Sequence, residues 1–218
     1  MPNTLIKSAL GLALGFLLTN PAVAVPLTPP TNANGTFVFD NDVEQFDFSI
    51  GVASIVTIES ISYAGGAFAS NPAIIAPAGG FDPILSLFDS TGAFIAAADD
   101  GSSTFDPVTG SAFDSFLQPT LDAGTYTVVI TQFDNFFLGG VGDDISTGFE
   151  QDGPPDNFTG FFGCGNGEFC DIGGNNRTNF FAVNVIAEAQ AVPEPSALAM
   201  IGFGLLGVGL AYRRRQRD

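Results

Sequence analysis

The stretch FDPILSLFDSTGAFIAAADDG, residues 81–101, carries the clearest folding signal in the chain. Apolar residues dominate 83–88 and 93–98, and the polar turn between them contains Thr91-Gly92. Two short apolar runs joined by a glycine-containing turn are typical of paired antiparallel strands. We therefore predict a β-hairpin here, and we interpret Asp82 and Asp89 as polar residues that close its ends.

The same strand-like periodicity continues from residue 36 to residue 186. The predicted strands are TFVF (36–39), QFDFSI (45–50), SIVTIESIS (54–62), PILSLF (83–88), AFIAAA (93–98), SFLQPTL (115–121), TYTVVITQF (125–133) and FFAVNVI (180–186). No segment between them has the period of an amphipathic helix, and Asp122-Ala123-Gly124 is predicted to be a second hairpin turn. About eight short strands with Gly, Asp and Pro turns predict an all-β fold, an antiparallel β-sandwich of jelly-roll-like topology over residues 36–190.

The first 24 residues have the layout of a secretory signal peptide. Lys7 precedes the apolar run ALGLALGFLL (9–18), and Ala22-Val23-Ala24 follows as a small-residue site. This order is that of a signal peptide cleaved after Ala24, with Ala22 and Ala24 as the recognised small residues. Residues 25–35 then form a proline-rich linker, and the protein is predicted to be exported.

Export bears on the two cysteines, Cys164 and Cys170, which lie in the long glycine-rich segment 136–179. In an oxidising compartment they are expected to form a disulfide, whose short loop stabilises the fold by about 2 kcal/mol. The alternative, a zinc site, is disfavoured because two thiolates without any histidine make a poor ligand set. Loops this long are usually functional, and we expect this one to fold over the sandwich.

The charge distribution limits the partners of the domain. The formal net charge is -17, and every acidic residue except Glu194 and Asp218 lies within residues 25–191. Arg177 is the only basic residue in that range. Such a polyanion repels nucleic acid and anionic headgroups, and it favours divalent cations or polyols. No nucleic-acid partner is therefore expected.

The absence of histidine argues against catalysis. It excludes serine and cysteine triads, histidine general bases and ordinary zinc sites. A glycosidase-type carboxylate pair is the one remaining route, and the chain lacks tryptophan, a common sugar-stacking residue. We predict a protein that is not an enzyme and has no catalytic residues, with a glycosidase as the remote alternative.

Calcium is the best candidate ligand, because hard cations prefer six to eight oxygen ligands. Adjacent acids that could supply them occur in three places: Asp40 and Asp42, Asp99 and Asp100, and Asp143 and Asp144. None matches an EF-hand loop. The alternative is that these acids only keep an apolar exported domain soluble, and both interpretations stay open.

Aromatic residues near the long segment have two interpretations of their own. Phe133, Phe136, Phe137, Phe161 and Phe162 could form a sugar-stacking platform, or they could be ordinary packing residues.

Three stretches carry a resemblance to a known family: VEQFDFSI (43–50), residues 79–101, and LDAGTYTVVITQFDNF (121–136). Together they resemble the bacterial pre-peptidase C-terminal-like domains. They are more similar to an uncharacterised secreted family that carries such a domain upstream of a PEP-CTERM signal. The resemblance implies a β-sandwich without catalytic activity. In the pre-peptidase group such domains accompany secreted proteases, and some related modules bind calcium or polymeric substrates.

The C-terminal residues 192–218, VPEPSALAMIGFGLLGVGLAYRRRQRD, combine three features of a sorting signal. The motif Val192-Pro193-Glu194-Pro195 comes first. Residues 196–212 are apolar and would span roughly 25 Å as a transmembrane helix. Arg213, Arg214 and Arg215 would then hold the end of the chain on the cytoplasmic side of the membrane.

This layout, over residues 191–218, closely resembles the PEP-CTERM sorting signal. The resemblance implies exosortase as a partner, cleavage near the triplet, and a Gram-negative host that makes exopolysaccharide. An ordinary single-span membrane anchor is the alternative. We therefore predict an exported, non-catalytic cell-surface or extracellular-matrix protein associated with exopolysaccharide or biofilm. A calcium-dependent carbohydrate- or protein-binding accessory module is the second hypothesis.

Overall fold

The computed structural model describes residues 32–69 and 71–190. Within these residues the fold is all-β with antiparallel sheets and two 3-10 helices, η1 (Ile145–Thr147) and η2 (Phe158–Phe162), which confirms the predicted fold class. No helix in this part of the chain is long and apolar enough to cross a membrane. The predicted signal peptide with Ala22 and Ala24, and the predicted sorting segment 191–218, lie outside the described residues.

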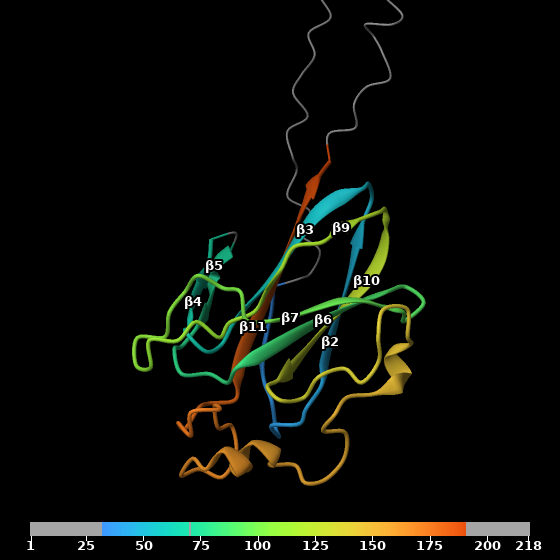
Figure 1. The fold of residues 1–218 in the computed structure, drawn as a ribbon. Helices are drawn as coiled ribbons and strands as arrows, with labels where there is room; N and C mark the ends of the chain where they lie inside the picture. The colour runs from blue at the N-terminus through green and yellow to red at the C-terminus, as the bar shows by residue number, and fades with distance from the viewer. Residues whose placement is uncertain (1–31, 70, 191–218) are drawn as a thin grey trace, which may run out of the picture.

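Two sheets form the sandwich (Figure 1). The first contains, in order, β1 (Asn32–Thr36), β11 (Phe180–Ala189), β3 (Ser54–Ile61) and β8 (Phe116–Leu117), and β9 (Thr120–Leu121) also pairs with β3. The second contains, in order, β2 (Glu44–Ile50), β10 (Gly124–Gln132), β6 (Pro83–Asp89) and β7 (Phe94–Asp99). β8 and β9 act as one interrupted strand. A small hairpin of β4 (Gly66–Phe68) and β5 (Asn71–Ala76) stands apart. Successive long strands therefore alternate between the sheets, except at the β6–β7 hairpin, which is a jelly-roll arrangement.

The core lies between the two sheets because side chains alternate across each strand. Val56 and Ile58 of β3 and Val183 and Val185 of β11 come from the first sheet. The second sheet contributes residues of the same core at every second position, Phe48, Ile50, Leu85, Leu87, Tyr126, Val128 and Ile130. The alternation of apolar residues in the sequence thus matches the alternation of side chains buried in the core.

The long segment after β10 covers the outer face of the second sheet. Phe149 is buried against Phe88 of β6 and Val129 of β10. Cys164 and Cys170 form the predicted disulfide. The expectation that this segment folds over the sandwich is therefore confirmed. The part of this segment that contains η2 lies at the opposite end of the molecule from the end of β11, as Figure 1 shows.

The first strand does not occupy residues 36–39 as predicted. β1 ends at Thr36, and its first four residues fall in the stretch expected to be linker. The Asp42 carboxylate accepts hydrogen bonds from the backbone N–H groups of Val38 and Phe39, at 2.6 and 3.0 Å. These bonds turn the chain after Phe37, whose ring stacks on Phe81 in the core. The apolar side chains of Val38 and Phe39 are left exposed.

The predicted hairpin turn at residues 122–124 is also wrong. β9 pairs with β3 in the first sheet, whereas β10 belongs to the second, so the chain crosses between sheets here. The Tyr126 hydroxyl donates to the Asp122 carbonyl at 2.9 Å, which is the hydrogen bond of a tyrosine corner. Residues 115–121 are likewise interrupted at Pro119, which has no N–H to donate to a ladder.

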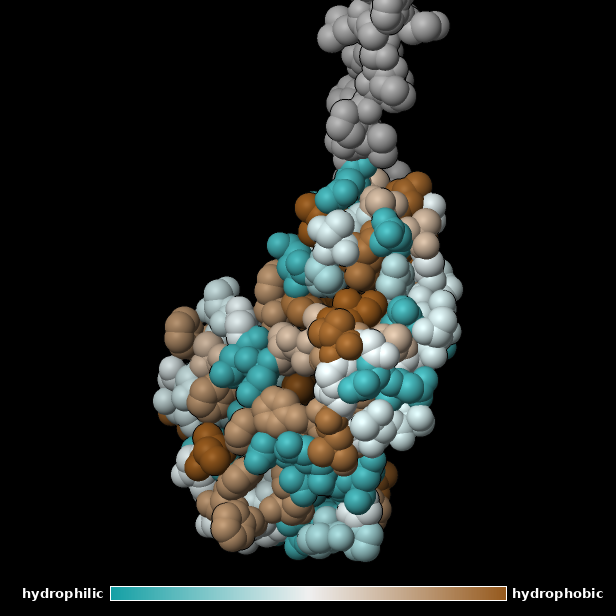
Figure 2. All heavy atoms as spheres, turned by 45° about the vertical axis from the view of Figure 1, so that its right-hand side comes forward, coloured by the Kyte–Doolittle hydropathy of each residue, from teal (hydrophilic) through white to brown (hydrophobic). Residues whose placement is uncertain are grey.

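On one face of the molecule (Figure 2), exposed apolar side chains are interspersed with polar ones. Figure 2 shows brown apolar groups separated by teal polar groups on the face it presents. Val108 and Phe161 are the most exposed of the large apolar side chains in the described residues, at 85% and 93%.

Candidate metal centre

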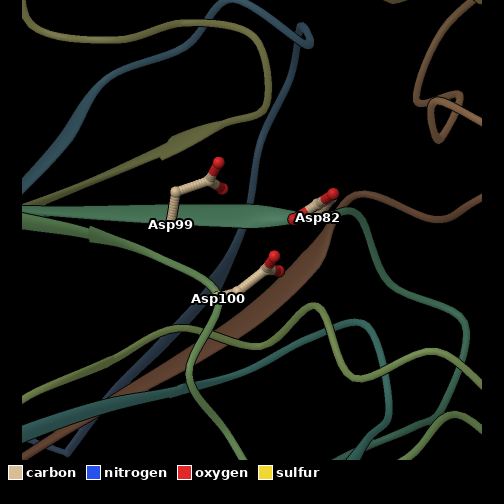
Figure 3. A group of neighbouring side chains, drawn as sticks. All are labelled: Asp82, Asp99 and Asp100. Carbon is tan, nitrogen blue, oxygen red and sulfur yellow. The ribbon is translucent and has the colours of Figure 1, made fainter.

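Three carboxylates meet where β6 begins and β7 ends. Asp82 directly precedes β6, Asp99 is the last residue of β7, and Asp100 follows it. In the antiparallel register Ile84 is opposite Asp99, so these chain ends lie side by side. One oxygen atom from each of the three aspartates lies within 4.8 Å of the other two. Figure 3 shows the carboxylates arranged around a common space.

The cluster runs from the protein interior to the solvent. Asp82 is 5% exposed, Asp100 is half-buried and Asp99 is exposed. The Oδ1 atoms of Asp82 and Asp100 are buried and have no hydrogen-bond partner. A buried acceptor without a partner is costly, so this arrangement calls for a compensating group.

Electrostatic repulsion reinforces this need. Burial, together with the negative charges of Asp99, Asp100, Asp114 and Asp171, raises the pKa of Asp82 to about 9. Although Asp99 as a whole residue is exposed, its carboxyl is partly desolvated within the cluster, and this desolvation, together with the charges of Asp100 and Asp134, raises its pKa to about 6. These shifts mean that the cluster strongly resists carrying its full negative charge.

The one basic side chain in the described residues is engaged elsewhere. Arg177 pairs with Asp106 at 3.3 Å, and its guanidinium carbon lies 3.5 Å from the centre of the Tyr63 ring. It also donates to the carbonyl oxygens of Gly80 and Tyr63, both at 2.8 Å. No cationic side chain of residues 32–69 and 71–190 therefore neutralises the three carboxylates.

The backbone around the cluster is held by bonds that do not use its carboxylates. The Asp100 N–H donates to the Ser115 hydroxyl at 3.1 Å, and that hydroxyl lies 2.6 Å from the Pro83 carbonyl oxygen. The Asp82 carbonyl accepts from the Phe133 N–H at 2.8 Å. Asp100 has a φ of 75°, a left-handed conformation that aspartate tolerates better than most residues. The carboxylates are thus positioned by the fold itself.

The other predicted acids do not join this cluster. The carboxylate of each accepts hydrogen bonds from backbone N–H groups instead. Asp40 accepts from the backbone N–H groups of Phe158 and Thr159, and Asp42 from those of Val38 and Phe39. Asp143 accepts from the Gly140 N–H at 2.7 Å, and Asp144 from the Ser146 N–H at 2.8 Å, where it caps η1. These four acids shape turns or hold the long segment to the sandwich.

The cluster adds one residue that the sequence interpretation missed. Asp82 was expected only to close the hairpin. An antiparallel hairpin places the residue before its first strand next to the residues after its second strand. The signal that could have identified Asp82 was thus its position across the hairpin from Asp99-Asp100.

The donor set suits a hard cation. Carboxylate oxygens are preferred by calcium and magnesium, whereas zinc favours nitrogen and sulfur ligands. The chain has no histidine, and its two cysteines are joined in the disulfide. The arrangement can therefore coordinate a divalent cation through oxygen, but it offers no softer ligand.

A cleft of about 280 Å³ lies between the end of β3, β4 and the loop after β7. Glu59, Ser102, Thr104 and Asp114 are among its lining residues. The Asp114 carboxylate accepts three backbone N–H groups, from Ser62, Tyr63 and Ala64. Glu59 accepts from the Asn184 amide at 2.9 Å. Both carboxylates of the cleft are thus already hydrogen-bonded.

The aromatic residues considered as a sugar platform are mostly packed together. The Phe137 ring centre lies 5.0 Å from that of Phe88, against the outer face of the second sheet. Phe133 contacts Phe136 and Phe162, with ring centres 5.8 and 6.2 Å apart. Phe161 is highly exposed. The packing interpretation describes these rings better than a flat stacking surface does.

Comparison with known proteins identifies the C-terminal segment. Residues 191–215 match the family model of the PEP-CTERM protein-sorting motif. The comparisons find no match to a curated protein or to a solved structure. They therefore give no support to the resemblance to pre-peptidase C-terminal-like domains. The match confirms the predicted sorting signal, and it implies that the chain is an exported protein of the cell envelope that is processed by exosortase.

Proposed function

We propose that this protein is a non-catalytic cell-surface or extracellular-matrix protein, which exosortase releases from its membrane-bound precursor as a jelly-roll domain. The observation that carries the proposal is the position of the sorting motif. β11 ends at Ala189, and the matched motif begins at residue 191. Cleavage near Pro193-Glu194-Pro195 would therefore remove the tail without cutting into the sandwich.

The last described residues support this division. Ala189 pairs with Ser54 of β3, and the Gln190 N–H donates to the Ala53 carbonyl at 2.9 Å. The hydrogen bonding of the sheet thus reaches the residue before the motif. A processed chain would keep every strand of the domain.

A non-catalytic role is supported by the side chains present. The chain has no histidine to act as a general base. In the cleft, the acceptor atoms of Asp114 bind three backbone N–H groups and so are poorly placed to act on a substrate. A panel of chromogenic glycosides should give no hydrolysis. Turnover that is lost in an Asp99→Asn variant would instead support the glycosidase alternative.

Processing is testable by mass spectrometry of the protein recovered from a host that has exosortase. We expect a C-terminus near the Pro193-Glu194-Pro195 triplet in the wild-type chain. Replacing all three residues by alanine should leave the arginine tail in place, because the recognised triplet is gone. Glu188→Ala is the matched control, since it alters an exposed acid just upstream and should be processed normally. An intact tail on the wild-type protein at the cell surface would favour an ordinary membrane anchor.

Association with exopolysaccharide is the proposed extracellular role. If the association exists, the protein should co-sediment with exopolysaccharide isolated from the producing strain. Retention on one defined polymer alone would favour a dedicated binding module. Absence of retention on any polymer would remove exopolysaccharide as a partner while leaving the sorting proposal intact.

A further inference from the structure

We propose that Asp82, Asp99 and Asp100 form a calcium site that joins the start of β6 to the end of β7. This proposal does not depend on the sorting function. It rests on a buried acceptor without a partner, on convergent oxygens and on uncompensated charge.

The first step is the contrast between Asp82 and two other buried acids; a further one, Asp106, also has an unpartnered Oδ1, but its Oδ2 is bound by Thr109 and Arg177. Asp40 and Asp114 are as deeply buried as Asp82, and each accepts at least two backbone N–H groups. The Asp82 Oδ1 atom has no hydrogen-bond donor, although its side chain is on the inner side of the cluster. Asp100 has a second such oxygen. A cation bound between the three carboxylates would give both aspartates the partner that the chain does not supply.

The second step is geometric. Calcium binds oxygen at 2.3–2.6 Å, so two oxygens on one ion can lie up to about 5 Å apart. The three aspartate oxygens lie within 4.8 Å of one another. They can therefore share one calcium ion with little rearrangement. Water can complete the coordination on the side of Asp99, which is exposed.

The third step concerns charge. Three carboxylates at one point repel each other, and Arg177 is bound to Asp106. A divalent cation neutralises most of the charge that ionisation of all three would create. Magnesium is less suitable, because it keeps most of its water and requires a nearly ideal octahedron. With three protein ligands and an open side, affinity is expected in the range of extracellular modules, with a Kd on the order of 10⁻⁴–10⁻³ M.

Thermal unfolding of the full-length chain in detergent tests the proposal. About 5 mM CaCl₂ should raise the Tm by about 3 °C over the same sample with chelator, because calcium binds the folded state. NaCl of equal ionic strength should not reproduce the shift. Asp99→Asn is the principal variant: Asp99 is exposed, so its loss should leave the fold intact while weakening calcium affinity on the order of 10-fold or more. Asp82→Asn should abolish the shift.

Asp156→Asn provides the matched control, because it removes one exposed carboxylate of the long segment, outside the cluster. It should retain the full calcium shift. The proposal is overturned if calcium does not stabilise the wild-type chain, or if Asp99→Asn binds calcium as tightly as the wild type. An equal shift with MgCl₂ would overturn the assignment to calcium.

Discussion

Arg177 shows how one residue can organise an acidic domain. It is 5% exposed and holds two backbone carbonyls, the Asp106 carboxylate and the Tyr63 ring. Burial would raise the pKa of Asp106, but hydrogen bonds from Thr109 and the charge of Arg177 lower it overall. Arg177 therefore stabilises buried negative charge that the rest of the domain cannot balance.

Arg177→Met should destabilise the protein by about 3–5 kcal/mol, because it leaves the Asp106 charge buried and unpaired. Urea unfolding of the full-length chain measures the loss. Asp106→Asn should cost less in the Arg177→Met background than in the wild type, since it then removes an uncompensated charge. Additive effects of the two substitutions would show that the pair does not act as a unit.

At the same scale, the sequence identifies some site residues and misses others. Asp99-Asp100 is recognisable as an acidic pair at the end of a strand. Asp82 has the local pattern of a turn residue, and it is buried at a place where distant segments meet the hairpin: the Phe133 N–H donates to its carbonyl and the Ser115 hydroxyl to that of Pro83. Burial by distant segments leaves no trace in the local sequence.

At the scale of the elements, strands that face the core were the most predictable. β2, β3, β10 and β11 alternate buried and exposed residues, or are buried over most of their length, and lie within a few residues of their predicted bounds. Three departures have local chemical causes: the Asp42 turn ends β1, Pro119 divides β8 from β9, and the corner at Tyr126 directs the chain to the other sheet. Side-chain hydrogen bonds can thus override strand periodicity.

Tyr126→Phe tests the corner. It removes one hydroxyl that donates to the Asp122 carbonyl and keeps the ring, which stacks on Phe48 with centres 5.6 Å apart. We expect a loss of about 1 kcal/mol in the free energy of unfolding, the usual size of one such bond. Thr125→Val, on the neighbouring residue of β10, removes a hydroxyl whose bond to Ser49 is exposed and should cost less. An equal loss in both variants would argue against a special role for the corner.

At the scale of the whole molecule, the strand order is what the sequence could not provide. Periodicity shows which faces are buried, but β11 pairs with β1 and β3, which lie far away in the chain. The jelly-roll topology could still be predicted, because short strands and tight turns restrict the possible architectures, and the observed strand order confirms it. The pairing itself depends on contacts between distant segments.

The acidic groups together predict an unusual pH dependence. In chelator, the Tm should fall as the pH rises from about 5 to about 9. Burial raises the pKa of Asp82 to about 9 and that of Asp114 to about 6, so the folded state binds protons that the unfolded state has already released near its ordinary value of 3.8. Stability therefore decreases with pH across this window. Groups with lowered pKa values, such as Asp89 and Asp144, contribute a constant stabilisation above their ordinary pKa of 3.8 and lose it only as the pH falls below that value, so they do not change the slope in this window.

Differential scanning calorimetry at several pH values measures this trend. The charges that raise the pKa of Asp82, besides its burial, are those of Asp99, Asp100, Asp114 and Asp171, and all four are negative when ionised. Asp82→Asn should flatten the decline, whereas Asp156→Asn should not. A Tm that rises steadily to pH 9 in the wild type would contradict the predicted direction.

The position of β11 has a mechanical consequence. It is an inner strand bonded along Asn32–Thr36 on one side and Ser54–Ile61 on the other, and its final residue faces away from the disulfide-bearing end of the molecule (Figure 1). A pull on Ala189 against the far end would act along the strand, perpendicular to its hydrogen bonds. Those bonds would be sheared together instead of opening one after another. At the end of the chain next to the sorting motif, tension would thus load the hydrogen bonds of a whole strand at once.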